Sequence, residues 1–158
     1  MKVDILAIGA HPDDVELGCG GTIAKLISEG KKVAIIDLTE GELGTRGTNE
    51  TRAQEAATAS EILGISAREN LKMKDGFIIN SQEYQFRIIE MIRKYQPEIV
   101  LCNAIDDRHP DHAKAAKLVS DACFLSGLVK IKTDYEGESQ KFWRPKQVFQ
   151  YIQWKNIE

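Results

Sequence analysis

The segment "KVDILAIGAHPDDVELGCGGTIAKLISEGKKVAIIDLT", residues 2–39, decides the fold. Its two ends, residues 2–10 and 31–39, are apolar runs of the kind found in strands that are buried on both faces. Between them, apolar residues at Ile23, Leu26 and Ile27 precede Gly30, a pattern that predicts a short amphipathic helix over 18–30. Strand, helix and strand in this order form a βαβ unit.

The alternation of strand and helix continues along the chain. We expect, in order, a helix at 49–63 with Ala53, Ala56, Ala57 and Leu63 facing inward, a strand at 70–75, a helix within 80–97 capped by Asn80 and Glu83, a strand at 98–104, a helix at 110–127, an irregular stretch at 128–145 and a strand at 147–154. This order predicts an α/β fold: a Rossmann-like, doubly wound, mostly parallel sheet with helices on both faces. At 158 residues, the chain is expected to form a single domain, 1–158.

Composition narrows the classes of function. The net charge is −3, from 21 Lys and Arg against 24 Asp and Glu, which gives no basic surface for nucleic acid or an anionic membrane. No apolar run approaches the roughly 18 residues of a membrane span. Three widely spaced cysteines argue against a disulfide framework and for a reducing compartment, so we expect a cytoplasmic protein.

Two short motifs contain every histidine of the chain. His11 opens "HPDD" (11–14) directly after the first strand, and His109 and His112 lie in "DDRHPDH" (106–112) after the fourth. In a doubly wound sheet the strand order reverses next to the first strand, so the loops after these two strands face each other. The three histidines are therefore expected to meet at one site. The adjacent carboxylates of Asp13 and Asp14 repel each other, and a cation would offset that repulsion.

This set of residues is typical of a catalytic metal site. Two imidazoles and one carboxylate leave an open coordination position, which suits catalysis better than a structural role. The best three ligands are His11, Asp14 and His112. Asp13 would then face a metal-bound water, whose pKa falls to about 7, and act as the general base. Zinc is the expected metal, with ferrous iron as the alternative that the same ligands suit.

The sequence resembles the LmbE-like, or PIG-L, family of metal-dependent N-acetylglucosamine deacetylases, through "AHPDDVELGCGGTIA" (10–24) and "DDRHPDHAKAAKLV" (106–119). It is most similar to the bacillithiol-biosynthesis deacetylases, which also carry a "LTEGELGTRGT" loop (38–48) followed by a "TRxxEA" helix. The resemblance implies a zinc-dependent hydrolase that removes acetyl from an N-acetylglucosamine-containing glycoside of the glucosaminyl malate type.

The resemblance also assigns roles to further residues. It implies that His109 stabilises the oxyanion and that Asp111 holds that imidazole in position. Arg52 matches a substrate-contacting arginine, and Glu42 lies in the loop that borders the sugar. Family members usually continue beyond the position of Glu158, so we expect a domain that is incomplete at its C-terminus, keeps its metal and has weak activity. Apolar surface near the C-terminal end would then be covered by another subunit, which predicts a homo-oligomer.

Two other functions remain open at this point. A metal-dependent phosphoesterase also uses Asp and His clusters but gathers carboxylates for two metals, and Asp106 and Asp107 are available as extra ligands. A sugar-binding or assembly module that holds a metal without turnover is the non-enzymatic alternative. One metal ion per chain favours the amidase, two favour the esterase, and binding without hydrolysis identifies the module.

Overall fold

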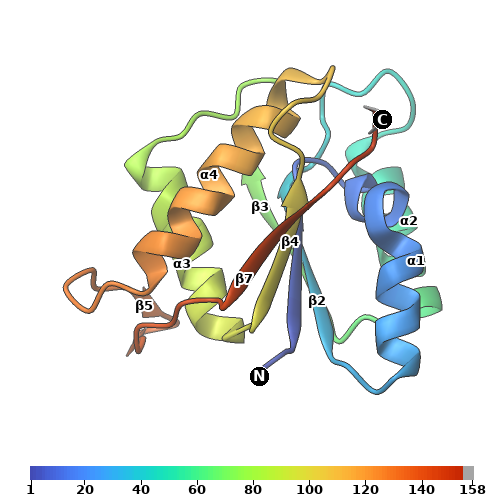
Figure 1. Cartoon of the computed structure of the whole chain (residues 1–158). Coiled ribbons are helices and arrows are strands. Elements are labelled where there is room, and N and C mark those ends of the chain that lie inside the picture. The colour runs from blue at the N-terminus through green and yellow to red at the C-terminus, as the bar shows by residue number, and fades with distance from the viewer. Residues whose placement is uncertain (155–158) are drawn as a thin grey trace.

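A five-stranded, all-parallel sheet runs through the middle of the protein in the order β3-β2-β1-β4-β7 (Figure 1). The strands are β1 (Ile5–Gly9), β2 (Val33–Thr39), β3 (Ala67–Met73), β4 (Ile99–Asn103) and β7 (Gln147–Tyr151). The computed structural model describes residues 1–154, so the expected end of the domain at Glu158 lies outside the described residues. This topology confirms the doubly wound α/β fold.

Helices cover both faces of the sheet. They are α1 (Asp14–Ser28), α2 (Asn49–Leu63), α3 (Gln82–Tyr95) and α4 (Pro110–Ser126). Figure 1 shows α1 and α2 on one face and α3 and α4 on the other. Among the described residues, no helix has both the length and the apolar character needed to cross a bilayer.

The central strand β1 supplies side chains to two hydrophobic cores. Leu6 and Ile8 pack into the core on the side of α3 and α4, whereas Ile5 and Ala7 pack into the core beneath α1. Successive side chains of a strand point to opposite faces, so a strand between two helical layers must be apolar throughout. This requirement explains why the first strand reads as a continuous apolar run.

Two helices differ in detail from their expected form. Ser81 caps α3, because its Oγ accepts the backbone N–H of Tyr84, while the Asn80 amide donates to Asp121 instead. The stripe expected for α2 faces the sheet but is not buried: Ala53, Ala56 and Ala57 line a cavity of about 240 Å³, and no residue of the helix is buried. Across this cavity the strands β2 and β3 present the polar side chains of Asp37, Arg68 and Asn70 to the helix.

Two other segments also differ from the sequence prediction. Strand β3 begins at Ala67, earlier than expected, because its charged residues find partners: Arg68 donates to the buried Asp37 carboxylate at 2.7 Å. The stretch 128–145 contains a small antiparallel hairpin, β5 (Asp134–Tyr135) and β6 (Glu138–Ser139). At its turn, Gly137 has a φ of 84°, which glycine adopts without steric cost.

Candidate metal centre

The first half of the site is the turn between β1 and α1. Residue Asp13 caps α1 with a φ of 125° and a ψ of −23°, an unusual conformation for a residue with a side chain. The turn is closed by Asp14, whose Oδ2 accepts the backbone N–H of His11 at 2.9 Å. Helix α1 consequently begins at Asp14, four residues earlier than expected, and its backbone departs from helical geometry at Cys19.

The second half is the first turn of α4. Pro110 occupies the start of this helix, where its missing N–H costs nothing. His109 caps the helix, and its Nδ1 accepts the backbone N–H of Asp111 at 3.2 Å. The capping bond fixes the His109 ring beside that of His112, with ring centroids 4.9 Å apart.

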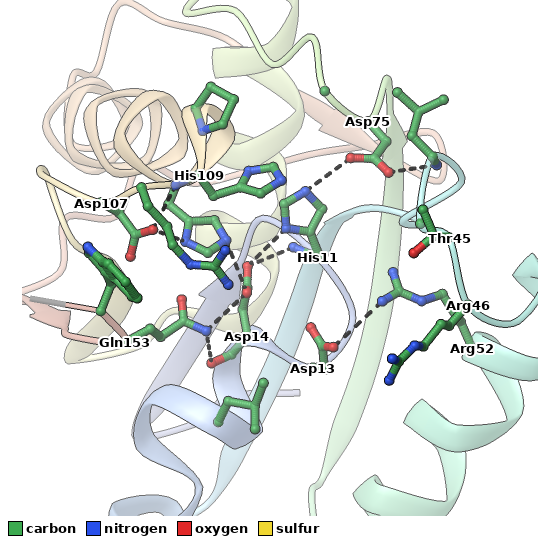
Figure 2. A pocket seen from close by; sticks show the side chains of 18 of the residues that line it. His11, Asp13, Asp14, Thr45, Arg46, Arg52, Asp75, Asp107, His109 and Gln153 are labelled. Carbon is green, nitrogen blue, oxygen red and sulfur yellow. Dashed lines mark hydrogen bonds and ion pairs between the residues drawn. The ribbon is translucent and has the colours of Figure 1, made fainter.

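The two halves bring all three histidines together, as the topology predicts. The ring centroid of His11 lies 4.6 Å from that of His109 and 5.4 Å from that of His112. The Asp14 carboxylate lies between two of the rings, with Oδ2 3.4 Å from His11 Nδ1 and Oδ1 3.2 Å from His112 Nε2. Figure 2 shows Asp14 at the centre of this cluster.

Two amides that sequence reasoning missed hold Asp14 in place. Asn103, at the carboxyl end of β4, donates to Asp14 Oδ2 at 3.1 Å and accepts the backbone N–H of Ala10 at 2.9 Å. Gln153 donates to Asp14 Oδ1 at 3.1 Å (Figure 2). Asn103 is the last residue of β4, at the carboxyl ends of the strands where the site forms, and this position could have identified it from the sequence. No comparable feature of the sequence identifies Gln153.

Two further carboxylates, Asp75 and Asp107, were also absent from the predicted site. Oδ1 of Asp75, just beyond β3, lies 3.0 Å from His11 Nε2, and Oδ1 of Asp107 lies 3.1 Å from His112 Nδ1. The sequence had named Asp107 only as an extra ligand for a second metal. Asp75 follows a strand at the same edge of the sheet, and that position was an available signal.

The electrostatics of the cluster favour a cation. Burial alone lowers the pKa of His11, but the hydrogen bond to Asp14 and the charges of Asp14, Asp75 and Asp111 raise it to about 9. Burial likewise raises the pKa of Asp14, but its contacts with His11 and His112 outweigh this and hold it well below its usual range. The carboxylates thus stabilise positive charge at this point.

Potential ligand atoms are close enough to share an ion. They lie within 4.8 Å of one another in the group His11, His109 and His112, and again in the group His11, Asp75 and Asp111. Imidazole nitrogen with carboxylate oxygen is a donor set that suits zinc or ferrous iron. The residues therefore fit a divalent metal ion.

Asp13 differs from its neighbour Asp14 in exposure. Its side chain is 52% exposed and its Oδ2 lies 3.6 Å from Arg52 Nη2. Burial and the Asp14 charge raise the pKa of Asp13, whereas Arg52 opposes that rise. Arg52 also donates to the carbonyl of Gly41 at 3.3 Å, so this helix α2 side chain points into the site and not towards solvent.

Two predicted residues contact the backbone of the loop after β3. The fully buried Asp111 carboxylate accepts N–H groups from Gly76 at 2.7 Å and Ile78 at 3.3 Å, and the Asp111 backbone N–H donates to the His109 ring. The Glu42 carboxylate accepts the N–H of Asp75 at 2.8 Å and does not line the cavity. Both carboxylates thus hold this loop against the site.

A cavity of about 860 Å³ opens over the cluster. His11, Asp13, Asp14, His109 and His112 form its floor. Its walls include Arg46, Arg52, Arg108, Leu43, Ile152 and Trp154. Cavities of this size admit a small molecule such as a sugar derivative.

Comparison with known proteins identifies relatives of the chain. Residues 6–123 match the PIG-L family, described as GlcNAc-PI de-N-acetylase. The diacetylchitobiose deacetylase of Thermococcus kodakarensis is 34% identical over 134 residues, covering 78% of this chain and 50% of that protein. The 4-oxalmesaconate hydratase of Pseudomonas putida is 29% identical over 134 residues, covering 77% of this chain and 52% of the hydratase.

Among solved structures, a conserved protein of Thermus thermophilus is 38% identical with a TM-score of 0.88, covering 99% of this chain and 68% of that one. The chain spans about half the length of the two curated relatives named above. The family match includes both loops of the site, with all three histidines and both aspartates of the turn after β1. The chain therefore belongs to the PIG-L family of GlcNAc-PI de-N-acetylases.

Proposed function

We propose that the protein is a metal-dependent N-deacetylase that hydrolyses the acetamide of an N-acetylglucosamine-type sugar. The observation that carries this proposal is the meeting of His11, Asp14 and His112 at the floor of one cavity, with the exposed Asp13 carboxylate beside them. Membership of the PIG-L family and similarity to a diacetylchitobiose deacetylase support it.

His11, Asp14 and His112 would hold the metal, with zinc as the first choice and ferrous iron as the alternative. When bound, such an ion acts as a Lewis acid and lowers the pKa of a bound water. Asn103 and Gln153 keep the Asp14 carboxylate oriented towards the two rings. The site is thus organised by neighbouring amides before any ligand arrives.

Asp13 would act as the general base. Its carboxylate takes a proton from the attacking water as the new C–O bond forms at the acetyl carbonyl, and the same proton passes to the sugar nitrogen as the C–N bond breaks. The products are acetic acid, which ionises to acetate, and a free amine. Arg52, at 3.6 Å, favours the ionised form of Asp13 and holds the carboxylate beside the cavity.

His109 would donate to the oxygen that becomes negative during this attack. Its Nδ1 already accepts the Asp111 N–H, so the neutral ring carries its proton on Nε2. Burial and the charges of His11 and His112 lower the pKa of His109, which favours this neutral form. A preorganised donor at such a position is typically worth 10²–10³ in rate.

The proposed substrate is a small amino-sugar conjugate, of the glucosaminyl malate type that the sequence resembles. Arg52 lines the cavity and is the proposed sugar contact. Glu42 would act indirectly, because its carboxylate holds the backbone at Asp75 and so shapes the 40–48 loop beside the cavity.

The test is acetate release by the purified protein from N-acetylglucosamine glycosides, with metal analysis on the same sample. We expect one ion per chain and release of acetate and free amine in equal amounts. His11→Ala and His112→Ala should lose most of the metal, since each removes one of three ligands. Stoichiometric metal in either variant would contradict the ligand assignment. Two ions with phosphoester cleavage would favour the phosphoesterase, and sugar binding without acetate the binding module.

A hydratase is a second candidate, favoured by the similarity to the 4-oxalmesaconate hydratase of Pseudomonas putida. That reaction class also delivers water to a substrate, but to a carbon–carbon double bond, so nothing is released. Loss of the ultraviolet absorbance of a conjugated unsaturated diacid, with no acetate formed from any glycoside, would favour this activity over deacetylation.

A further inference from the structure

His11 and His112 each direct one ring nitrogen towards Asp14 and the other towards a second carboxylate. Nδ1 of His11 lies 3.4 Å from Asp14 Oδ2, whereas its Nε2 lies 3.0 Å from Asp75 Oδ1. His112 has the opposite arrangement, with Nε2 3.2 Å from Asp14 Oδ1 and Nδ1 3.1 Å from Asp107 Oδ1. Asp14 thus lies on the inner side of both rings, and Asp75 and Asp107 lie on their outer sides.

A neutral imidazole that gives one lone pair to a metal carries its proton on the other nitrogen, and the partner of that N–H orients the ring. We infer that Asp75 and Asp107 are positioning residues of the metal centre, accepting the protons on His11 Nε2 and His112 Nδ1. His11 Nδ1 and His112 Nε2 then face Asp14 as free lone pairs. This inference rests on the metal site of the proposed function.

The contacts of Asp75 suit this role. The residue is buried, and both of its carboxylate oxygens are engaged: Oδ1 with His11 Nε2, and Oδ2 with the N–H of Leu43 at 2.8 Å (Figure 2). Its own N–H is held by Glu42 at 2.8 Å. A carboxylate fixed through both oxygens and its backbone can orient the His11 ring.

The alternative is a metal held by His11 Nε2, Asp75 and Asp111, whose ligand atoms lie within 4.8 Å of one another. Asp111 argues against it. Each of its oxygens already accepts a backbone N–H, from Gly76 and from Ile78. Ligation on that side would compete with backbone bonds at both Asp111 oxygens, which hold the loop after β3. At Asp14 only Oδ2 accepts a backbone N–H, from His11, and Oδ1 is bonded by the Gln153 side chain.

Asp107 has a related but distinct environment. Its Oδ1 accepts the backbone N–H of His109 at 2.9 Å and also faces His112 Nδ1. Within residues 1–154, His112 Nδ1 is a buried atom that makes no hydrogen bond of good geometry, and Asp107 is the carboxylate that its distance identifies as acceptor. One oxygen of Asp107 therefore faces both donors.

This difference sets the expected effects of two isosteric variants. An amide has a single oxygen, so in Asp75→Asn one of the two N–H donors must face an NH₂ group, and zinc affinity should fall by about 10–100-fold. In Asp107→Asn the one oxygen can still meet both donors and only charge is lost, so the fall should stay below about 10-fold. Asp107→Ala removes the acceptor and should match Asp75→Asn.

The measurement is zinc affinity by competition with a chromogenic chelator, together with the visible absorption of the cobalt-substituted protein, which reports the ligand set. Asp14→Asn is the comparison for a lost ligand, and Asp121→Asn on α4, away from the cluster, is the matched control with wild-type affinity expected. Asp75→Asn and Asp107→Ala should keep one cobalt ion and a wild-type spectrum. Thermal unfolding of the metal-free variants checks that each is folded.

Wild-type affinity in both Asp75→Asn and Asp107→Ala would overturn the inference. So would complete loss of metal in Asp75→Asn to the extent seen in Asp14→Asn, because Asp75 would then be a ligand. A wild-type protein that binds zinc but releases no acetate would overturn the proposed function alone. A wild-type protein that binds no zinc would overturn both.

Discussion

At the scale of single residues, Asp13 is held in a conformation that side chains rarely adopt, with a φ of 125°. Residues in such sparsely populated regions cost about 1–3 kcal/mol and cluster at functional sites. The conformation places the Asp13 carboxylate in the cavity, while its neighbour Asp14 faces inward. Two adjacent aspartates thereby obtain different surroundings and different roles.

The difference in roles gives a first prediction. Asp13→Asn should keep stoichiometric metal, because the residue is not a proposed ligand, and lose turnover by about 10² or more, because an amide cannot act as a base. Acetate release and metal content on the same sample measure both effects. An Asp13→Asn protein without metal, paired with an Asp14→Asn protein that keeps it, would reverse the two assignments.

The backbone of the same residue gives a second prediction. Asp13→Gly should be more stable than Asp13→Asn by about 1 kcal/mol, since glycine relieves the strain at this φ but loses more entropy on folding. Both variants lack the charge that pairs with Arg52, so their difference reports mainly the backbone. Urea unfolding of the metal-free proteins measures it, and equal stability would show that the turn is not strained.

At the scale of elements, the 40–48 loop and α2 meet at Arg52. A Cβ on Gly41 would overlap Arg52 Nη1, and Gly41 has a φ of 67°. We therefore expect Gly41→Ala to displace the guanidinium and lower kcat/KM by about 10-fold or more, the effect of losing one charged hydrogen bond. Steady-state acetate release checks this.

Gly137, at the turn of the β5–β6 hairpin, provides the matched control for Gly41→Ala. Its φ is 84°, yet a Cβ there would meet nothing within 4 Å. Gly137→Ala should cost about 1 kcal/mol of stability from the backbone alone and leave kcat/KM unchanged. If the two alanine variants had the same kcat/KM, the position of Arg52 would not depend on Gly41.

Helices α3 and α4 are joined by a buried arginine. Arg93 donates to backbone carbonyls where α4 ends, those of Ser126, Leu128 and Ile131, and to the Thr133 hydroxyl. Arg93→Ala removes a buried charged donor and its four hydrogen bonds, so we expect a loss of about 3 kcal/mol in the free energy of unfolding. Metal stoichiometry should not change, because the site lies at the other end of α4.

Lys117→Ala is the control for this prediction, because Lys117 forms an exposed ion pair with Asp121 on α4. Such pairs contribute about 0.5 kcal/mol or less. Urea unfolding of both variants measures the two losses in the free energy of unfolding, and we expect the loss to be larger for the buried Arg93 than for the exposed Lys117. A cost for Arg93→Ala as small as that for Lys117→Ala would mean that the α4 end is held by packing alone.

At the scale of the whole molecule, the proposed ligands come from segments far apart in sequence, the turn after β1 and the first turn of α4. An ion that binds them only in the folded state stabilises the fold by about 2.7 kcal/mol when free metal is 100 times Kd. A chelator should therefore lower Tm of the wild-type protein by several degrees. His11→Ala should show no such shift, and a shift of equal size would place the ion elsewhere.

The sequence was sufficient to predict the meeting of His11, His109 and His112, because topology alone brings the loops after β1 and β4 together. The same topology was sufficient to place Asp14 beside these histidines. Strand β3 was predicted too late in the chain, since the Arg68–Asp37 pair lets a charged segment lie half-buried. No local pattern carries that information.

The partners of the site were harder to predict than its centre. Asp75 and Gln153 contact His11 and Asp14 from positions 64 and 139 residues away in sequence. Such contacts depend on how loops settle after the sheet has formed. The place of Asp75 after a strand is its one signal in the sequence, and nothing in the residues around Gln153 marks it. The burial expected for the α2 stripe did not occur for a related reason: alanines at helical spacing can face polar side chains as well as apolar ones.

The two oxygens of Asp75 have one further consequence. One holds His11 and the other holds Leu43, in the loop that borders the cavity. A ligand that moves this loop therefore shifts the Asp75 carboxylate and changes its hydrogen bond to His11. The affinity of the site for its ion changes with that bond. Thermodynamic linkage makes the effect reciprocal: the factor by which the ligand changes ion affinity equals the factor by which the ion changes ligand affinity.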